Sequence, residues 1–70
     1  MTQTTLEIIA RNVRLRRHTL GISQEELAER AGLHRTYVGA VERAEKNLTI
    51  SSLEKLAIGL KTTVASLVAA

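Results

Sequence analysis

The stretch that decides the fold is SQEELAERAGLHRTYVGAVE, residues 23–42. It opens on Ser23, a hydroxyl-bearing residue of the kind that caps the first turn of a helix. Gly32 interrupts the stretch in its middle, and glycine readily adopts the positive φ with which many helices end. Two short helices joined by so short a glycine-bearing turn cross at a steep angle. We therefore expect helices near 23–31 and 34–43 that cross in this way.

Small and apolar residues mark the faces on which these two helices meet. Leu27, Val38 and Val41 have the spacing of an inward-facing stripe. Ala28 is small and allows the second helix to approach closely. The spacing, the turn and the small residue together predict a helix-turn-helix unit over residues 23–42.

Helical patterns extend on both sides of this unit. The sequence has no proline and almost no aromatic residue. Three capping boxes, Thr4 with Glu7, Ser23 with Glu26 and Ser51 with Glu54, mark helix starts, and Thr63 can cap a short last helix. We expect an all-α fold, a compact five-helix bundle. Its helices are predicted near 5–20, 23–31, 34–43, 51–60 and 64–69.

Apolar residues three and four positions apart identify the core. Arg17 interrupts this pattern, four residues after Val13 and three before Leu20. A partly buried guanidinium needs an acidic partner, and we expect Glu42 to pair with it. The alternative is a surface arginine whose stem lies along the core while its charge stays in water. The predicted core is Leu6, Ile9, Val13, Leu20, Leu27, Ala28, Ala31, Val38, Val41, Leu53, Leu56, Ala57 and Leu60.

Length and composition limit the classes of function. Seventy residues form one domain, 1–70, and a domain this small buries only roughly 60% of its unfolded surface and often oligomerises. The chain has no cysteine and only two histidines, His18 and His34, far apart in the sequence, so we expect no metal site. No cluster of acid, base and nucleophile suggests an enzyme, and we expect no catalytic residue and no cofactor. The net charge of +3 suits a polyanionic partner.

Neither a membrane anchor nor a secretion signal is evident. No apolar run approaches the roughly 20 residues that span a bilayer. The start of the chain, MTQTTLEIIAR, lacks the basic segment of a signal peptide. We therefore expect a cytoplasmic protein without a membrane partner.

The motif resembles that of a known family. Residues 9–67 resemble the lambdoid phage repressor and Cro family of XRE type. SQEELAERAGLHRTYVGAVER followed by NLTI is especially similar to its restriction–modification controller proteins. The resemblance implies a lambda repressor-like domain that regulates transcription, as repressor or activator, by binding a palindromic operator as a homodimer. The implied partners are double-stranded DNA and a second copy of the chain, with RNA polymerase a further candidate.

Other interpretations remain beside the controller. Within the same class, the chain could be a phage-type repressor or an antitoxin that represses its own operon. A different class is a helical protein–protein adaptor that binds no DNA. The chain also departs from the family, which usually has glycine where this sequence has Ala44 and Lys61. A left-handed conformation at Ala44 would cost roughly 1–2 kcal/mol.

The opening turn of the second motif helix carries the side chains expected to read bases, because this turn enters the major groove. Arg35 can bind guanine O6 and N7, and Thr36 can meet a base or a thymine methyl group. Tyr37 can reach a phosphate or the sugar and base, unless it covers the edge of the core. Ala40 is small and lets the helix lie close to the groove floor. His34 is expected to cap the helix or to meet a phosphate.

A second group is expected to hold the DNA backbone. Gln24 follows the Ser23 cap, so its amide and the free N–H groups of that helix start can face one phosphate. Arg43, Lys46 and Asn47 follow the second motif helix, and the resemblance implies backbone contacts for them too. The alternative is an ordinary solvated, charged loop.

The last predicted helix, 64–69, is almost wholly apolar. We expect Val64 and Leu67 to reach the core, and Val68 with Ile58 to stay exposed. An exposed apolar strip on a small domain indicates a partner surface. A symmetric dimer fits, because palindromic operators match a two-fold axis. The predicted dimer interface comprises Ile58, Val64, Leu67 and Val68.

Overall fold

The computed structural model describes residues 3–70, which form five helices and no strand in that range. The predicted all-α, five-helix fold with its central helix-turn-helix is confirmed, and each helix end lies within one residue of its predicted position. The helices are α1 (Thr5–Leu20), α2 (Gln24–Ala31), α3 (Arg35–Glu42), α4 (Ile50–Gly59) and α5 (Val64–Val68).

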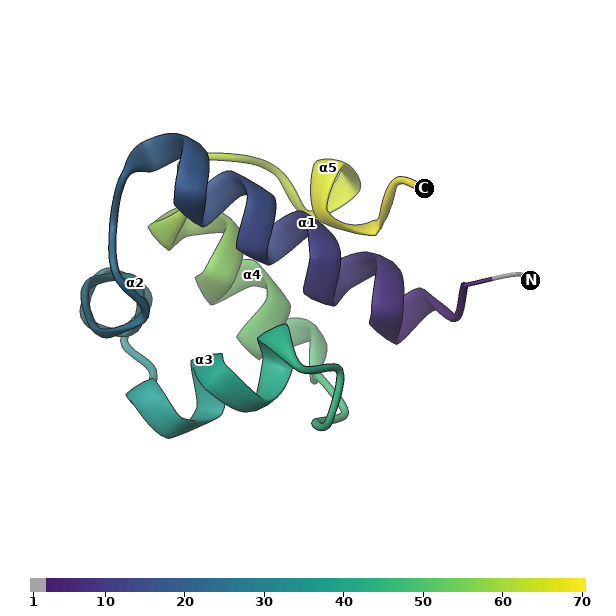
Figure 1. The fold of residues 1–70 in the computed structure, drawn as a ribbon, viewed down its shortest axis with the longest axis horizontal. Coiled ribbons are helices and arrows are strands. Elements are labelled where there is room, and N and C mark those ends of the chain that lie inside the picture. The colour runs from purple at the N-terminus through teal and green to yellow at the C-terminus, as the bar shows by residue number, and fades with distance from the viewer. Residues whose placement is uncertain (1–2) are drawn as a thin grey trace.

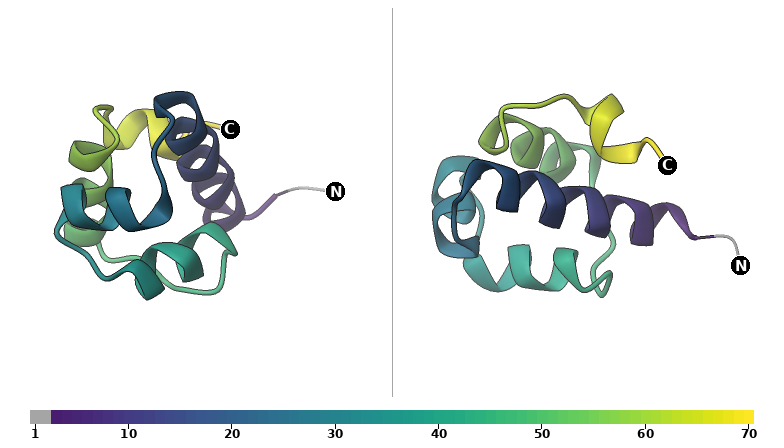
Figure 2. Two further views of the ribbon diagram at one scale, coloured as in Figure 1. Left: turned by 60° about the vertical axis from the view of Figure 1, so that its left-hand side comes forward. Right: turned by 45° about the horizontal axis from the view of Figure 1, so that its top comes forward.

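The longest helix, α1, runs through the middle of the molecule (Figure 1). It packs against α3 and α5, while α2 packs against α3 and α4. Figure 2 shows α3 and α5 on opposite sides of α1. The motif helix that is expected to meet DNA and the apolar last helix therefore occupy different faces. No helix within residues 3–70 has the length and apolar character needed to cross a bilayer.

The N-cap residue of four of the five helices is a serine or threonine whose hydroxyl accepts a hydrogen bond from the helix backbone. The Thr4 capping box is confirmed: the Thr4 N–H donates to Glu7 Oε1 at 2.9 Å, and the Glu7 N–H donates to Thr4 Oγ1 at 3.1 Å. Ser23 Oγ accepts the Glu26 N–H at 3.0 Å, and Thr63 Oγ1 accepts from the backbone of α5. These local hydrogen bonds satisfy backbone donors that have no partner inside the helix.

The predicted N-cap of α4 is wrong. Thr49, not Ser51, is the N-cap, and its hydroxyl accepts the Ser52 N–H at 3.0 Å. The helix therefore begins at Ile50, and Ser51 and Glu54 form no capping box. Both threonine and serine are good cap residues, so the local pattern alone did not distinguish them.

Four helices end in the same way. In each case a residue with positive φ follows the helix, and the N–H of the next residue donates to the carbonyl five positions before it. This arrangement satisfies carbonyls at the helix end. Two of the four residues are not glycine, so the left-handed conformation anticipated at Ala44 is confirmed. They are Gly21 (φ 68°), Gly32 (68°), Ala44 (57°) and Lys61 (54°).

The core lies between all five helices and contains most of the predicted residues. The prediction that Leu6 belongs to the core is wrong, because this residue is half-buried in the first turn of α1 and lies outside the core cluster. Leu20 packs against the core from its edge. The buried residues are Ile9, Ala10, Val13, Ile22, Leu27, Ala28, Ala31, Val38, Val41, Leu53, Leu56, Ala57, Leu60 and Leu67.

Side chains of α1 donate hydrogen bonds to the backbone carbonyls at the ends of α4 and α5. Asn12 Nδ2 donates to the carbonyls of Leu67 at 2.9 Å and Ala69 at 2.8 Å. Arg16 donates to the carbonyls of Leu60 at 2.9 Å and Lys61 at 3.0 Å. Because cations and amide donors satisfy free carbonyls at helix ends, α1 fixes how the C-terminal part of the chain docks.

Candidate nucleic-acid interface

The first turn of α3 presents polar groups to solvent. His34 occupies the N-cap position, but its side chain makes no capping hydrogen bond, so the predicted capping role is wrong. Arg35 and Thr36 are exposed, as base-reading residues must be. Tyr37 is half-buried and packs against the core, which matches the core-edge alternative. The N–H groups of this helix start have no side-chain cap, and a ligand could therefore use them.

A shallow pocket brings residues of both expected DNA-contacting groups together. Its volume is about 210 Å³, and it lies where the start of α2 meets the outer face of α3. Arg35, which is expected to read bases, and Arg43, which is expected to bind the DNA backbone, both line this pocket. The lining residues are Gln24, Arg35, Thr36, Gly39 and Arg43.

Gly39 leaves the space in which two of these side chains lie. A Cβ atom at this position would be 3.1 Å from Arg43 Nη1 and 3.6 Å from Gln24 Oε1. The first of these separations is tighter than ordinary van der Waals contact. The guanidinium of Arg43 therefore lies across the backbone of α3 at the one residue without a side chain.

A buried ion pair lies beneath this surface and joins α1 to α3. Arg17 Nε is 2.7 Å from Glu42 Oε2, and Arg17 Nη2 is 3.0 Å from Glu42 Oε1. The two side chains are 13% and 3% exposed. The structure thus places the two predicted partners in a bidentate contact, the strongest geometry for an arginine and a carboxylate.

The same carboxylate holds the start of α2. Gln24 Nε2 donates to Glu42 Oε1 at 3.1 Å, and Arg17 Nη1 donates to the Ile22 carbonyl at 3.1 Å. One amide N–H of Gln24 is therefore used internally, which the sequence did not reveal. The second N–H of that amide is available for a phosphate.

The environment keeps this pair charged. Burial raises the pKa of Glu42, but the hydrogen bonds from Arg17 and Gln24 and the positive charge of Arg17 outweigh it, so the pKa lies below the ordinary 4.5. The hydrogen bond with Glu42 raises the pKa of Arg17. Since the charged forms favour each other, the pair fixes the start of α2 relative to the end of α3 at neutral pH.

The loop after α3 carries the remaining expected phosphate contacts. Arg43 Nε is 2.9 Å from Glu45 Oε1, and both side chains are exposed. Lys46 and Asn47 are exposed as well. Neither makes a side-chain hydrogen bond or an ion pair within residues 3–70. The structure thus brings Arg43 to the pocket beside α3 but leaves Lys46 and Asn47 outside its lining.

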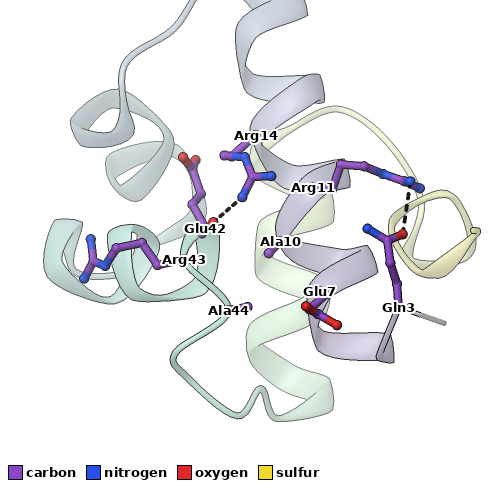
Figure 3. A pocket seen from close by; sticks show the side chains of 8 residues that line it. All are labelled: Gln3, Glu7, Ala10, Arg11, Arg14, Glu42, Arg43 and Ala44. Carbon is purple, nitrogen blue, oxygen red and sulfur yellow. Dashed lines mark hydrogen bonds between the residues drawn. The ribbon is translucent and has the colours of Figure 1, made fainter. Parts of the chain in front are cut away.

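Two further arginines of α1 lie near this region: Arg14 points toward Glu42 at the end of α3, whereas Arg11 points away from the loop toward Gln3 (Figure 3). Arg14 Nη1 donates to the Glu42 carbonyl at the end of α3, and Arg11 Nη1 donates to Gln3 Oε1 at 3.3 Å. Neither arginine is among the site residues predicted from the sequence, although their spacing of three on α1 places them on one helical face. They line a pocket of about 270 Å³ together with Gln3, Glu7, Ala10, Glu42, Arg43 and Ala44.

The four predicted dimer residues have different environments. Ile58 is 73% exposed and Val68 is 40% exposed, whereas Val64 is half-buried against the core. Leu67 is only 1% exposed, so its assignment to the interface is wrong. Its side chain belongs to the core cluster, and its backbone carbonyl accepts a hydrogen bond from Asn12 on α1. Two more exposed apolar side chains, Leu15 and Ile50, were not anticipated.

Comparison with known proteins adds independent information. A family model for the helix-turn-helix matches residues 13–67. The control protein C.SmaI of Serratia marcescens is 56% identical over 61 residues, which is 87% of this chain and 73% of that protein.

Solved structures share the fold. The hypothetical transcription factor NHTF from Neisseria superposes with a TM-score of 0.91 and 45% identity, covering 96% of this chain and 77% of that one. The restriction–modification controller protein C.Esp1396I has been solved as a tetramer in complex with its natural 35 base-pair operator. It superposes with a TM-score of 0.86 and 33% identity, covering 94% of this chain and 87% of that one.

Proposed function

Since the chain belongs to the helix-turn-helix family, we propose that it is a transcriptional regulator of the restriction–modification controller type. It binds a palindromic DNA operator as a homodimer. The similarity to C.SmaI and to the operator-bound C.Esp1396I supports the controller assignment. Binding is the whole of the proposed activity, and no catalytic step is included.

The pocket between α2 and α3 is the observation that carries this proposal. It places the exposed Arg35 and Thr36 beside Gln24 and Arg43. Sequence-specific DNA binding needs both base-edge contacts, which discriminate, and phosphate contacts, which position the protein. A helical adaptor would not need these four side chains on one face.

Each residue has a distinct role in the proposed complex. Arg35 and Thr36 read base edges, and the small Ala40 lets α3 approach the groove. The amide of Gln24 and the cap at Ser23 meet one phosphate through side-chain and backbone N–H groups.

The flanks of the motif contact the DNA backbone. Arg43 supplies the main charge there, and His34, Lys46 and Asn47 add polar contacts from exposed positions. Tyr37, which is half-buried, supports the edge of the core and can still reach the sugar.

The second copy binds through the side of the molecule away from α3. Ile58 and Val68 are exposed apolar side chains on the adjacent helices α4 and α5. Val64 lies at the edge of the same region, half-buried. Because α5 lies across α1 from α3 (Figure 2), a dimer formed here leaves both copies of α3 free for DNA.

A footprint tests the proposal directly. The purified protein is titrated against duplex DNA from upstream of its own gene and against a scrambled duplex of equal length. We expect protection of two half-sites about one helical turn apart, roughly 34 Å. Affinity should fall with salt, with a log–log slope of roughly −0.9 per phosphate neutralised. Failure to bind any duplex at low salt would exclude a DNA-binding role and favour the adaptor.

A further inference from the structure

The ion pair between Arg43 and Glu45 lies at the edge of the proposed DNA-binding face. Arg43 Nε and Glu45 Oε1 are 2.9 Å apart. Arg43 also lines the pocket that contains Gln24, Arg35 and Thr36. A carboxylate is thus bound to a guanidinium that faces the proposed site of a DNA phosphate.

The surroundings of the ion pair position the Arg43 guanidinium and the backbone of Glu45. The Arg43 guanidinium lies against Gly39, with Nη1 3.1 Å and Cζ 3.9 Å from where a Cβ atom would be. The Glu45 N–H donates to the Ala40 carbonyl at 2.9 Å, and the preceding Ala44 has a φ of 57°. The turn after α3 therefore fixes the backbone from which the exposed Glu45 side chain reaches Arg43.

We propose that Glu45 competes with the DNA phosphate for Arg43 and so lowers the affinity of the protein for DNA of any sequence. This inference rests on the proposed DNA-binding function. Carboxylates and phosphates accept hydrogen bonds from a guanidinium in the same geometry. A phosphate must therefore displace the Glu45 carboxylate or share Arg43 with it. Exposed ion pairs are weak, so the competition moderates binding and does not prevent it.

This competition is independent of base sequence. Phosphates are the same on operator and random DNA, so Glu45 lowers both affinities by a similar factor. Base contacts by Arg35 and Thr36 then supply the preference for the operator. Glu45 thereby reduces the time that the protein spends on non-specific DNA, while the ratio of the two affinities stays unchanged.

The test compares Glu45→Gln with Glu54→Gln as a matched control. Glu54 is an exposed glutamate on α4 without a side-chain hydrogen bond or ion pair in the part of the chain that the structure describes. Each protein is titrated against the upstream duplex and the scrambled duplex at several salt concentrations. Glu45→Gln should tighten binding to both by about two- to fivefold at low salt. Glu54→Gln should change either affinity by a much smaller factor, because its charge is screened.

A double-mutant cycle identifies Arg43 as the group through which Glu45 acts. In an Arg43→Ala background, Glu45→Gln should lose most of its gain, because no guanidinium remains to be released. An equal gain with and without Arg43 would overturn the proposal, since Glu45 would then only repel phosphates. Equal effects of Glu45→Gln and Glu54→Gln would also overturn it. If the wild type binds neither duplex, the proposed function itself fails. Circular dichroism and melting temperature confirm that the exposed substitutions leave the fold intact.

Discussion

Among individual residues, Arg17 and Glu42 form a contact that joins α1 to α3, and Glu42 also accepts a hydrogen bond from Gln24 at the start of α2. Removing either partner leaves a charge that is buried (Glu42) or partly buried (Arg17) without its counterion. We expect Arg17→Met and Glu42→Gln each to cost about 3–5 kcal/mol in free energy of unfolding. The double variant should lose far less than the sum of the two. Denaturant unfolding measures the loss of stability in the two single variants and the double variant. Additive losses below about 0.5 kcal/mol would show that Arg17 and Glu42 are ordinary surface charges.

The same pair makes stability depend on pH. Because the pKa of Glu42 is lowered in the folded state from 4.5, its contribution is complete above the unfolded pKa and is lost as pH falls through the folded pKa. The wild type should therefore lose stability as the solution is acidified below about pH 5. Glu42→Gln should lose less over this range. The pKa of Glu7 is also lowered, by its capping contacts with Thr4, but Glu7 is present in both proteins and cancels in the comparison.

Two residues with left-handed conformations offer a way to stabilise the chain. Ala44 and Lys61 have φ values of 57° and 54°. This conformation destabilises a non-glycine residue by roughly 1–2 kcal/mol. Replacing that residue by glycine removes this strain, but glycine loses more backbone entropy on folding, which reduces the gain by roughly 0.5–1 kcal/mol. Ala44→Gly and Lys61→Gly should each stabilise the protein by about 0.5–1 kcal/mol, which is a rise of several degrees in melting temperature. Ala65→Gly within α5 is the control and should lower the melting temperature. A lower melting temperature for Ala44→Gly as well would show that Ala44 is not strained.

At the level of elements, the start of α4 depends on one hydroxyl. Thr49 accepts the Ser52 N–H, whereas Ser51 lies inside the helix. Loss of an N-cap costs about 1 kcal/mol, so Thr49→Ala should reduce stability by this amount. Ser51→Ala should stay within about 0.5 kcal/mol of the wild type. Chemical denaturation measures the free energy of unfolding of both variants. A larger loss for Ser51→Ala than for Thr49→Ala would show that Ser51 is the N-cap, as the sequence predicts.

The elements also show what the sequence could reveal. Capping residues and apolar periodicity act within a few positions, which is why every helix was predicted to within one residue. Thr49 and Ser51 satisfy the same local rule, so only the structure decided between them. Gln24 and Glu42 are far apart in the chain, and their hydrogen bond depends on how α2 docks against α3. The burial of Leu67 likewise depends on the docking of α5 against α1.

For the whole molecule, the separation of α3 from α5 places the proposed DNA-binding surface and the proposed dimer interface on different faces. Val68→Asp or Ile58→Asp should weaken the dimer by placing a charge at an apolar contact. Leu67→Asp should instead unfold the chain, because Leu67 is 1% exposed. Analytical ultracentrifugation with circular dichroism separates loss of association from loss of fold. If Val68→Asp and Ile58→Asp stay dimeric while Leu15→Asp dissociates, the interface lies on α1.

Recognition by the dimer combines base reading with backbone binding, and two arginines should separate these contributions. Arg35→Ala removes the proposed bidentate guanine contact and should therefore cost about 1–3 kcal/mol on the operator. The same change should leave affinity for random DNA almost unaltered, because that affinity depends on phosphates. Arg43→Ala should weaken binding to both duplexes and reduce the salt slope by about one unit.

Titration of both variants against operator and scrambled duplex, over a range of salt concentrations, decides between these roles. Arg35 is exposed and Arg43 pairs only with an exposed glutamate among the residues that the structure describes, so both variants should keep the wild-type melting temperature. If Arg35→Ala lowers both affinities equally, Arg35 binds phosphate. Specificity would then depend on Thr36, on the sugar and base contacts of Tyr37, or on the shape of the DNA, which can be read without any base contact.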